Sequence, residues 1–145
     1  MLYSTSNEEQ TIALGEQLAR EYPIPVTMLL IGELGAGKTT LAKGIASGYG
    51  AAQYDDVSSP TFPLIHEYGA PTRVYHVDLY RLETVAEVET LGLDEIFERP
   101  AAVLLEWAER FPKLLPKRRI EIRLAAVEDE AGCETRRIEV TEVNE

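Results

Sequence analysis

Residues 26–47 read VTMLLIGELGAGKTTLAKGIAS, and this stretch decides the fold. It opens with a continuous apolar run, residues 26–31, which is typical of a strand buried on both faces. A glycine-rich turn follows, and residues 38–47 then place Leu41 and Ile45 at helical spacing. A buried strand, a glycine-rich turn and a helix, in that order, predict the first unit of an α/β domain.

The turn matches the phosphate-binding loop (P-loop) pattern G-x-x-x-x-G-K-[ST] at every fixed position. Glycines permit positive φ and close approach to phosphate oxygens. The backbone N–H groups of the loop and the start of the helix together form an anion site. Lys38 is expected to reach the β- and γ-phosphates of ATP, and Thr39 to offer its hydroxyl to Mg²⁺. The predicted nucleotide-binding residues here are Glu33, Leu34, Gly35, Ala36, Gly37, Lys38, Thr39 and Thr40.

Hydrolysis also needs a carboxylate near the Mg²⁺ and its waters. Glu106 follows the buried run 103–105, and a strand beside the P-loop strand would deliver it to the phosphate end of the sheet. It would either order a Mg²⁺-bound water or orient the attacking water. Asp78 is the second candidate for catalysis and metal binding, because a lone Asp in a strand needs a partner. A metal, Arg81 or an ordinary hydrogen bond would supply that partner.

Four further residues each leave two interpretations open. Thr61, within Ser-Ser-Pro-Thr-Phe, is either a hydroxyl that contacts the γ-phosphate or Mg²⁺, as in nucleotide switches, or part of a strand-initiating turn. His76 is either structural or catalytic. Arg81 either stabilises charge on the γ-phosphate or forms a salt bridge. Trp107 either packs in the core or contributes to a partner surface.

The remaining pattern predicts a three-layer α/β/α P-loop NTPase fold, in a single domain over residues 1–145. We expect a mainly parallel central sheet with antiparallel edge strands. Capping boxes at Ser6 and Thr84 mark two helix starts. The predicted helices cover residues 7–21, 38–47, 84–92 and 94–98, and the predicted strands cover 26–31, 62–68, 73–80, 101–105, 118–124 and 135–143.

The composition narrows the class of protein. Hydrophobic residues make up 45% of the chain, as in globular proteins. Neither a membrane-spanning run nor a signal-peptide pattern is visible, so we expect a cytoplasmic protein without a membrane partner. The single cysteine, Cys133, excludes an intramolecular disulfide. The net charge of −11 opposes direct binding of a nucleic-acid backbone, which suggests that another protein holds any nucleic acid. The alternative interpretation is that the acidic surface only keeps the protein in solution.

The motifs together resemble one family, TsaE (YjeE). They are the P-loop 32–40, Ser-Pro-Thr-Phe 59–62, His-Val-Asp-Leu-Tyr-Arg 76–81 and Leu-Glu-Trp 105–107, in the order and spacing of that family. The resemblance spans nearly the whole chain. It implies a bacterial ATPase needed for N6-threonylcarbamoyladenosine at adenosine 37 of tRNAs that read codons beginning with A. It also implies action with the TsaB–TsaD complex, hydrolysis that is weak alone and stimulated by that complex, and only indirect contact with tRNA.

Carried over to this sequence, the resemblance implies ATP and Mg²⁺ as cofactors. Lys38 and Thr39 would act at the phosphates and the metal. Thr61 would be switch-like, and Asp78 and Glu106 would be catalytic or metal-linked.

The resemblance reaches three other positions less directly. The N-terminal stretch with Ser6 and Thr11 resembles the region that contacts the adenine side of the nucleotide in the family. The resemblance also implies that Trp107 has a functional role. One departure is Ala108, where the family commonly has proline. This loosens the turn but removes no chemical group.

Three other functions compete with this prediction. A small-molecule P-loop kinase, the main alternative, needs an acceptor pocket and a basic lid. The predicted strands 118–124 and 135–143 are expected to pair as an antiparallel hairpin. Its basic residues are expected away from the P-loop: Lys117, Arg118, Arg119, Arg136 and Arg137. A GTP-dependent switch would need an Asn/Thr-Lys-x-Asp motif to bind guanine, and this sequence contains none. A nucleotide-binding module without turnover would overlap with the family prediction.

Overall fold

The computed structural model of the chain describes residues 1–33, 35–51, 64–69, 71–128 and 130–144. Within them the strands are β1 (Leu2–Thr5), β2 (Val26–Ile31), β3 (Ile65–Tyr68), β4 (Val74–Asp78), β5 (Ala102–Glu106), β6 (Arg118–Glu128) and β7 (Glu134–Asn144). The helices are α1 (Glu8–Glu21), α2 (Lys38–Gly48), α3 (Val85–Glu89) and α4 (Leu93–Phe97). Two 3-10 turns, η2 (Ala108–Arg110) and η3 (Pro112–Leu114), follow β5.

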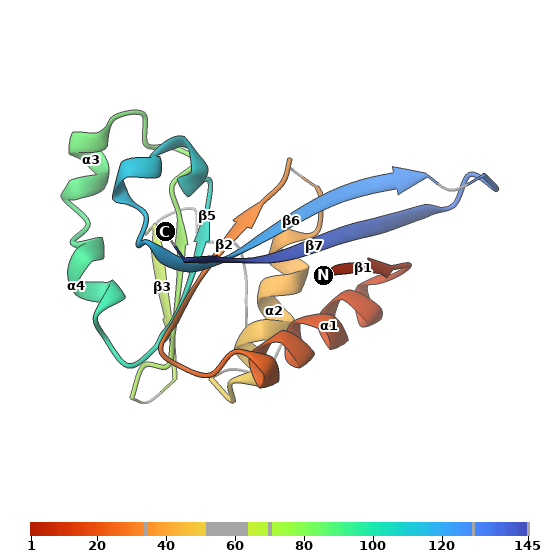
Figure 1. Ribbon diagram of the computed structural model, residues 1–145, viewed down its shortest axis with the longest axis horizontal. Helices are drawn as coiled ribbons and strands as arrows, with labels where there is room; N and C mark the ends of the chain where they lie inside the picture. The colour runs from red at the N-terminus through yellow and green to blue at the C-terminus, as the bar shows by residue number, and fades with distance from the viewer. Residues whose placement is uncertain (34, 52–63, 70, 129, 145) are drawn as a thin grey trace.

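These strands form one sheet in the order β1-β7-β6-β2-β5-β4-β3 (Figure 1). The central strands β6, β2, β5 and β4 run parallel to one another. On one side β7 pairs antiparallel with β6 and β1 antiparallel with β7, and on the other side β3 pairs antiparallel with β4. The predicted mainly parallel sheet with antiparallel edge strands is therefore confirmed.

Helices cover both faces of this sheet (Figure 1). On one face α1 and α2 pack against alternate strand residues, among them Met28, Leu104 and Ile122. On the other face α3, α4 and the 3-10 turns pack against the intervening residues, such as Leu29 and Leu105. Because successive strand residues point to opposite faces, burial on both sides requires the continuous apolar runs seen in the sequence. The predicted three layers are present.

Helices α1 and α2 cross where each has a glycine. A Cβ added to Gly44 would lie 2.1 Å from the carbonyl oxygen of Ile12, and one added to Gly15 would lie 2.6 Å from that of Leu41. Both opposing atoms are backbone carbonyl oxygens, which cannot move aside for a methyl group as the end of a flexible side chain could. The two glycines therefore let the helix backbones approach closely, and this contact fixes α1 beside the helix that follows the P-loop.

Gly44→Ala is expected to destabilise the protein, although alanine is the better helix former. The new methyl group would collide with the Ile12 carbonyl, and such overpacking costs up to about 3 kcal/mol. Helix propensity returns only about 1 kcal/mol. A net loss of ~2 kcal/mol lowers the Tm in thermal unfolding by about 6 °C.

The matched control is Ser47→Ala, at a half-buried position of the same helix. It adds no atoms and should leave the Tm unchanged or slightly raised. A Gly44→Ala protein as stable as the wild type would contradict the close helix contact.

The start of α1 differs from its prediction by one residue. Its N-cap is Asn7, whose Oδ1 accepts the amide hydrogen of Gln10 at 2.8 Å. The amide of Ser6 donates to the Gln10 side chain at 2.6 Å. Asn and Ser cap helices about equally well, so local preference does not decide between neighbouring positions. The capping box predicted at Thr84 is confirmed.

Strand β1 lies outside the predicted elements. Its short sequence has no alternating pattern, and its partner β7 supplies the pairing, with Tyr3 opposite Ile138 and Thr5 opposite Arg136. Strands β6 and β7 both extend beyond their predicted bounds, because the two continue to pair with each other out to Glu128 and Glu134. In the described part of the chain, no helix is both long and apolar enough to cross a membrane.

Candidate functional site

The carboxyl ends of three neighbouring strands meet at one edge of the sheet. Strand β2 ends at Ile31 and leads into the P-loop, while β4 and β5 end at Asp78 and Glu106. In the sheet register Glu106 lies opposite both Leu30 and Asp78. The two predicted carboxylates are thus neighbours beside the P-loop. Both are buried, with 7% of Asp78 and 2% of Glu106 exposed.

The P-loop has a backbone that requires its glycines. Gly35 and Gly37 have φ values of +84° and +101°, in the left-handed region that favours glycine. Helix α2 begins directly after Gly37, and within the described residues it has neither a side-chain cap nor an acidic residue in its first turn. The first amides of the helix therefore remain available to another acceptor. The helix dipole makes this end positive, so a phosphate group fits there.

The side chain of Lys38 is buried beside this loop. It is 5% exposed, and its Nζ has no hydrogen-bond partner among the described residues. The ammonium group lies 3.7 Å from the centroid of the Trp107 ring, a cation–π contact. Burial lowers the pKa of Lys38, while the carboxylates of Glu106, Glu109 and Asp78 act in the opposite direction. A buried cation with unused donors is suited to receive a phosphate oxygen.

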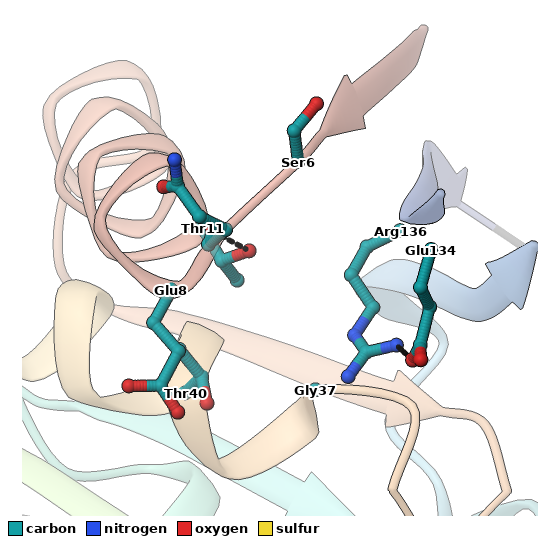
Figure 2. Close-up of a pocket in the computed structure, with 8 residues that line it drawn as sticks. Ser6, Glu8, Thr11, Gly37, Thr40, Glu134 and Arg136 are labelled. Carbon is teal, nitrogen blue, oxygen red and sulfur yellow. Dashed lines mark hydrogen bonds and ion pairs between the residues drawn. The ribbon is translucent and has the colours of Figure 1, made fainter. Parts of the chain in front are cut away.

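These groups line one cleft of about 480 Å³. It is walled by the P-loop, the start of α2 and the ends of β4 and β5, and its lining residues are Gly35, Gly37, Lys38, Thr39, Thr40, Asp78, Tyr80, Arg81, Glu106, Trp107 and Arg136. A second hollow, of about 240 Å³, adjoins the cleft, since both are lined by Gly37, Thr40 and Arg136. Figure 2 shows this hollow between α1 on one side and β7 on the other.

Arg136 lies against the P-loop, so the expectation that all the hairpin's basic residues lie away from it is wrong. A Cβ on Gly37 would be 3.3 Å from the Nε of Arg136. Arg136 also forms an ion pair with Glu134 on the same strand (Figure 2). Strand β6 pairs in parallel with β2, with Arg123 opposite Ile31, and this brings the hairpin to the P-loop edge of the sheet. The contact depends on long-range pairing, for which the local sequence contains no signal.

Most of the predicted site residues meet in these two hollows. Of those predictions, the cleft contains Gly35, Gly37, Lys38, Thr39, Thr40, Asp78 and Glu106, and the adjoining hollow contains Ser6 and Thr11. Glu33 is exposed, the side chain of Ala36 packs into the core, and neither residue is among the described lining of the hollows. Their predicted role is through backbone amides, so it stays a prediction. Leu34 and Thr61 lie outside the described residues, so their predicted roles stay predictions.

Tyr80 and Trp107 form one wall of the cleft. Their ring centroids are 5.0 Å apart, and Tyr80 lies beyond the end of β4, not in the strand as predicted. Arg110 donates to the carbonyl oxygens of Leu79, Tyr80 and Leu82, which holds the chain that follows β4. Trp107 has a φ of +66°. This conformation costs a residue with a side chain about 1 kcal/mol, and it sets the indole over the Lys38 ammonium.

Magnesium fits the oxygen donors at this edge of the sheet. Thr39 offers a hydroxyl, and Asp78 and Glu106 offer carboxylates. Among the described residues no group of three or more His, Cys, Asp or Glu is placed to hold a metal by itself. Mg²⁺ usually binds through one or two carboxylates together with water and substrate phosphates. The donor set therefore suits a Mg²⁺ ion that arrives with a phosphate ligand.

The family model described as threonylcarbamoyl adenosine biosynthesis protein TsaE matches residues 5–138. The chain belongs to the TsaE family. The matched range contains every described residue that lines the two hollows. The resemblance inferred from the sequence motifs is thereby confirmed.

Individual TsaE relatives match over most of their length. The tRNA threonylcarbamoyladenosine biosynthesis protein TsaE of Bacillus subtilis is 40% identical over 142 residues, covering 97% of this chain and 85% of the relative. The protein of the same name from Haemophilus influenzae is 37% identical over 110 residues, covering 75% and 68%.

A solved structure agrees with these sequence matches. The crystal structure of Bacillus subtilis YdiB matches with a TM-score of 0.77 at 33% identity, covering 99% of this chain and 86% of that one. The predicted P-loop fold is thus confirmed. The matches support the TsaE prediction and give no support to the small-molecule kinase alternative.

Proposed function

We propose that this chain is a Mg²⁺-dependent ATPase that serves N6-threonylcarbamoyladenosine synthesis at adenosine 37 of ANN-decoding tRNAs. The observation that carries the proposal is the meeting of Lys38, Asp78 and Glu106 in one cleft at the P-loop. A buried cation and two carboxylates complement a triphosphate and its magnesium ion. The relatives named TsaE support the assignment to this tRNA modification.

The nucleotide would occupy both hollows. Its phosphates would lie against the start of α2, where the backbone amides and the Nζ of Lys38 are donors. Thr39, together with the two carboxylates, would hold Mg²⁺ directly or through its waters, and the ion when bound offsets the phosphate charge. The nucleoside would extend into the adjoining hollow, which Ser6 and Thr11 line next to the P-loop.

Of the two carboxylates, Glu106 is better placed to orient the attacking water. Strand β5 lies directly beside the P-loop strand β2, whereas β4 is one strand further away. Asp78 would then act mainly at the metal.

We also propose the TsaB–TsaD complex as the partner, on the strength of the family resemblance. The net charge of −11 opposes direct binding of a tRNA backbone. The tRNA would therefore be held by the partner complex, and the tRNA modification would take place in the cytoplasm. Hydrolysis of ATP would support the reaction that the partners carry out.

Reconstitution with the TsaB–TsaD complex tests this function. We expect the ATPase rate of the chain to rise at least about tenfold when the complex is added, a change of only ~1.4 kcal/mol in the activation barrier. Repeated rounds of tRNA modification, measured by mass spectrometry of tRNA nucleosides, should require both the chain and ATP.

The complex without this chain and the chain without the complex are the two controls. An ATPase rate that is the same with and without the TsaB–TsaD complex would count against the accessory role. Transfer of phosphate to a small molecule in an acceptor panel would instead favour a kinase.

A further inference from the structure

His76 lies directly behind the carboxylate of Glu106. It is in the middle of β4 and has no exposed surface, and its Nε2 is 2.5 Å from Oε2 of Glu106. Glu106 lines the cleft, whereas His76 is not among the described residues that do so. The imidazole therefore contacts the carboxylate from the core side and has no access to a ligand in the cleft.

We assign the hydrogen in this contact to the imidazole ring. When Glu106 is ionised its carboxylate can only accept, and Nε2–H of His76 is then the donor to Oε2 of Glu106. The other ring nitrogen, Nδ1, has no hydrogen-bond partner among the described residues. The bond to Glu106 therefore sets the ring orientation, and in return the ring fixes one oxygen of the carboxylate.

An apolar residue would fill this core position at lower cost. Val74 lies two residues earlier on the same strand face, and Leu104 lies opposite His76 on β5, both buried. Burying an imidazole costs desolvation free energy that a Val or Leu would not. A buried polar pair is also weak evidence for a gain in stability. Orientation of Glu106 is a benefit that an apolar residue does not provide, since hydrogen-bonded partners align functional side chains.

We propose that His76 is a positioning residue for ATP hydrolysis. Its Nε2–H holds Oε2 of Glu106, so that the carboxylate keeps the orientation in which it aligns a water in the cleft. This inference rests on the proposed ATPase function. His76 touches neither nucleotide nor metal and acts through Glu106 alone.

The first test is NMR spectroscopy of the nucleotide-free chain with labelled histidine. We expect the Nε2 of His76 to carry the hydrogen and its proton signal to lie far downfield, as in a short hydrogen bond to a carboxylate. The signal should be lost in Glu106→Ala. The matched control is His66, which lies opposite His76 in the sheet and contacts the Tyr68 hydroxyl through Nδ1. Its signals should not change.

The second test separates binding from turnover. His76→Leu removes the donor at similar volume, and His76→Gln restores a side-chain N–H at similar reach. With the TsaB–TsaD complex present, single-turnover hydrolysis of Mg-ATP by His76→Leu should fall about 10- to 100-fold. Its affinity for ATP should not change, and His76→Gln should recover most of the rate. His66→Leu, the matched control, should hydrolyse at the wild-type rate.

The third test is a double-mutant cycle. In a Glu106→Gln background, His76→Leu should cause no further loss, because a residue that acts through another has nothing left to position. A wild-type rate in folded His76→Leu, or an independent loss in the double variant, would overturn the proposal. If His76→Leu fails to fold, the hydrolysis rate of His76→Gln and the NMR signal of the wild type test the proposal instead. Absence of the downfield signal in the wild-type chain would overturn the proposal. Failure of the proposed function looks different, because the wild type itself would then not hydrolyse Mg-ATP.

Discussion

Lys38→Ala should weaken the binding of Mg-ATP about 100-fold without loss of the fold. The Nζ of Lys38 is buried in the cleft and has no hydrogen-bond partner in the described part of the chain. A hydrogen bond from a charged group is worth up to about 3 kcal/mol. That free energy corresponds to about 100-fold in affinity. Arg136 lines the same cleft but is paired with Glu134, so it does not replace the lost charge. Isothermal titration calorimetry with Mg-ATP measures the change.

Thermal unfolding supplies an internal check on Lys38→Ala. Burial lowers the pKa of Lys38, so folding disfavours its charged form. Removing the amine should leave the Tm unchanged or raise it. Lys43→Ala is the matched control, because Lys43 is in the same helix and lines neither hollow. Wild-type affinity in the Lys38 variant would contradict the assignment of the cleft to phosphate.

Glu106→Gln should slow hydrolysis strongly, to a residual rate that can still be measured, and spare ATP binding. The substitution keeps the size of the side chain and its ability to accept a hydrogen bond, but removes the charge that orients and activates a water. Loss of such a group typically costs about 10²- to 10⁴-fold in rate. A residue that acts mainly in the transition state has little influence on substrate affinity. Rapid-quench measurement of Mg-ATP hydrolysis, beside calorimetry on the same protein, separates the two effects.

Glu109→Gln is the matched control for this substitution. Glu109 also acts electrostatically on Lys38, but it is not among the described residues of the cleft. Both variants therefore lose a negative charge that acts on Lys38. Only Glu106→Gln also loses the carboxylate in the cleft, so only this variant should lose turnover. If Glu106→Gln hydrolyses ATP at the wild-type rate, the water-orienting role passes to Asp78.

The P-loop, the parallel centre of the sheet and the two carboxylates could be predicted because each depends on short-range pattern. The apolar run 26–31 has the length and continuity of a strand buried on both faces. The glycines of the P-loop are required by its backbone, as the positive φ of Gly37 illustrates. Glu106 and Asp78 each end a buried strand, and parallel neighbours bring such ends together.

The features that could not be predicted depend on partners far away in the chain. Strand β1 exists because β7 pairs with it, and four residues contain too little pattern to indicate this. The contact of Arg136 with the P-loop requires the pairing of β6 with β2 and the register of the hairpin. The contact of His76 with Glu106 requires the register of β4 with β5, so the sequence left its role open.

The position of Trp107 gives the protein an intrinsic optical reporter. It is the only tryptophan in the chain, and its indole lies against the Lys38 ammonium. A ligand that draws this amine away changes the surroundings of the indole, so ultraviolet emission can follow occupancy in real time without a dye. With no second indole in the sequence, the tryptophan emission of the isolated chain comes from this one residue.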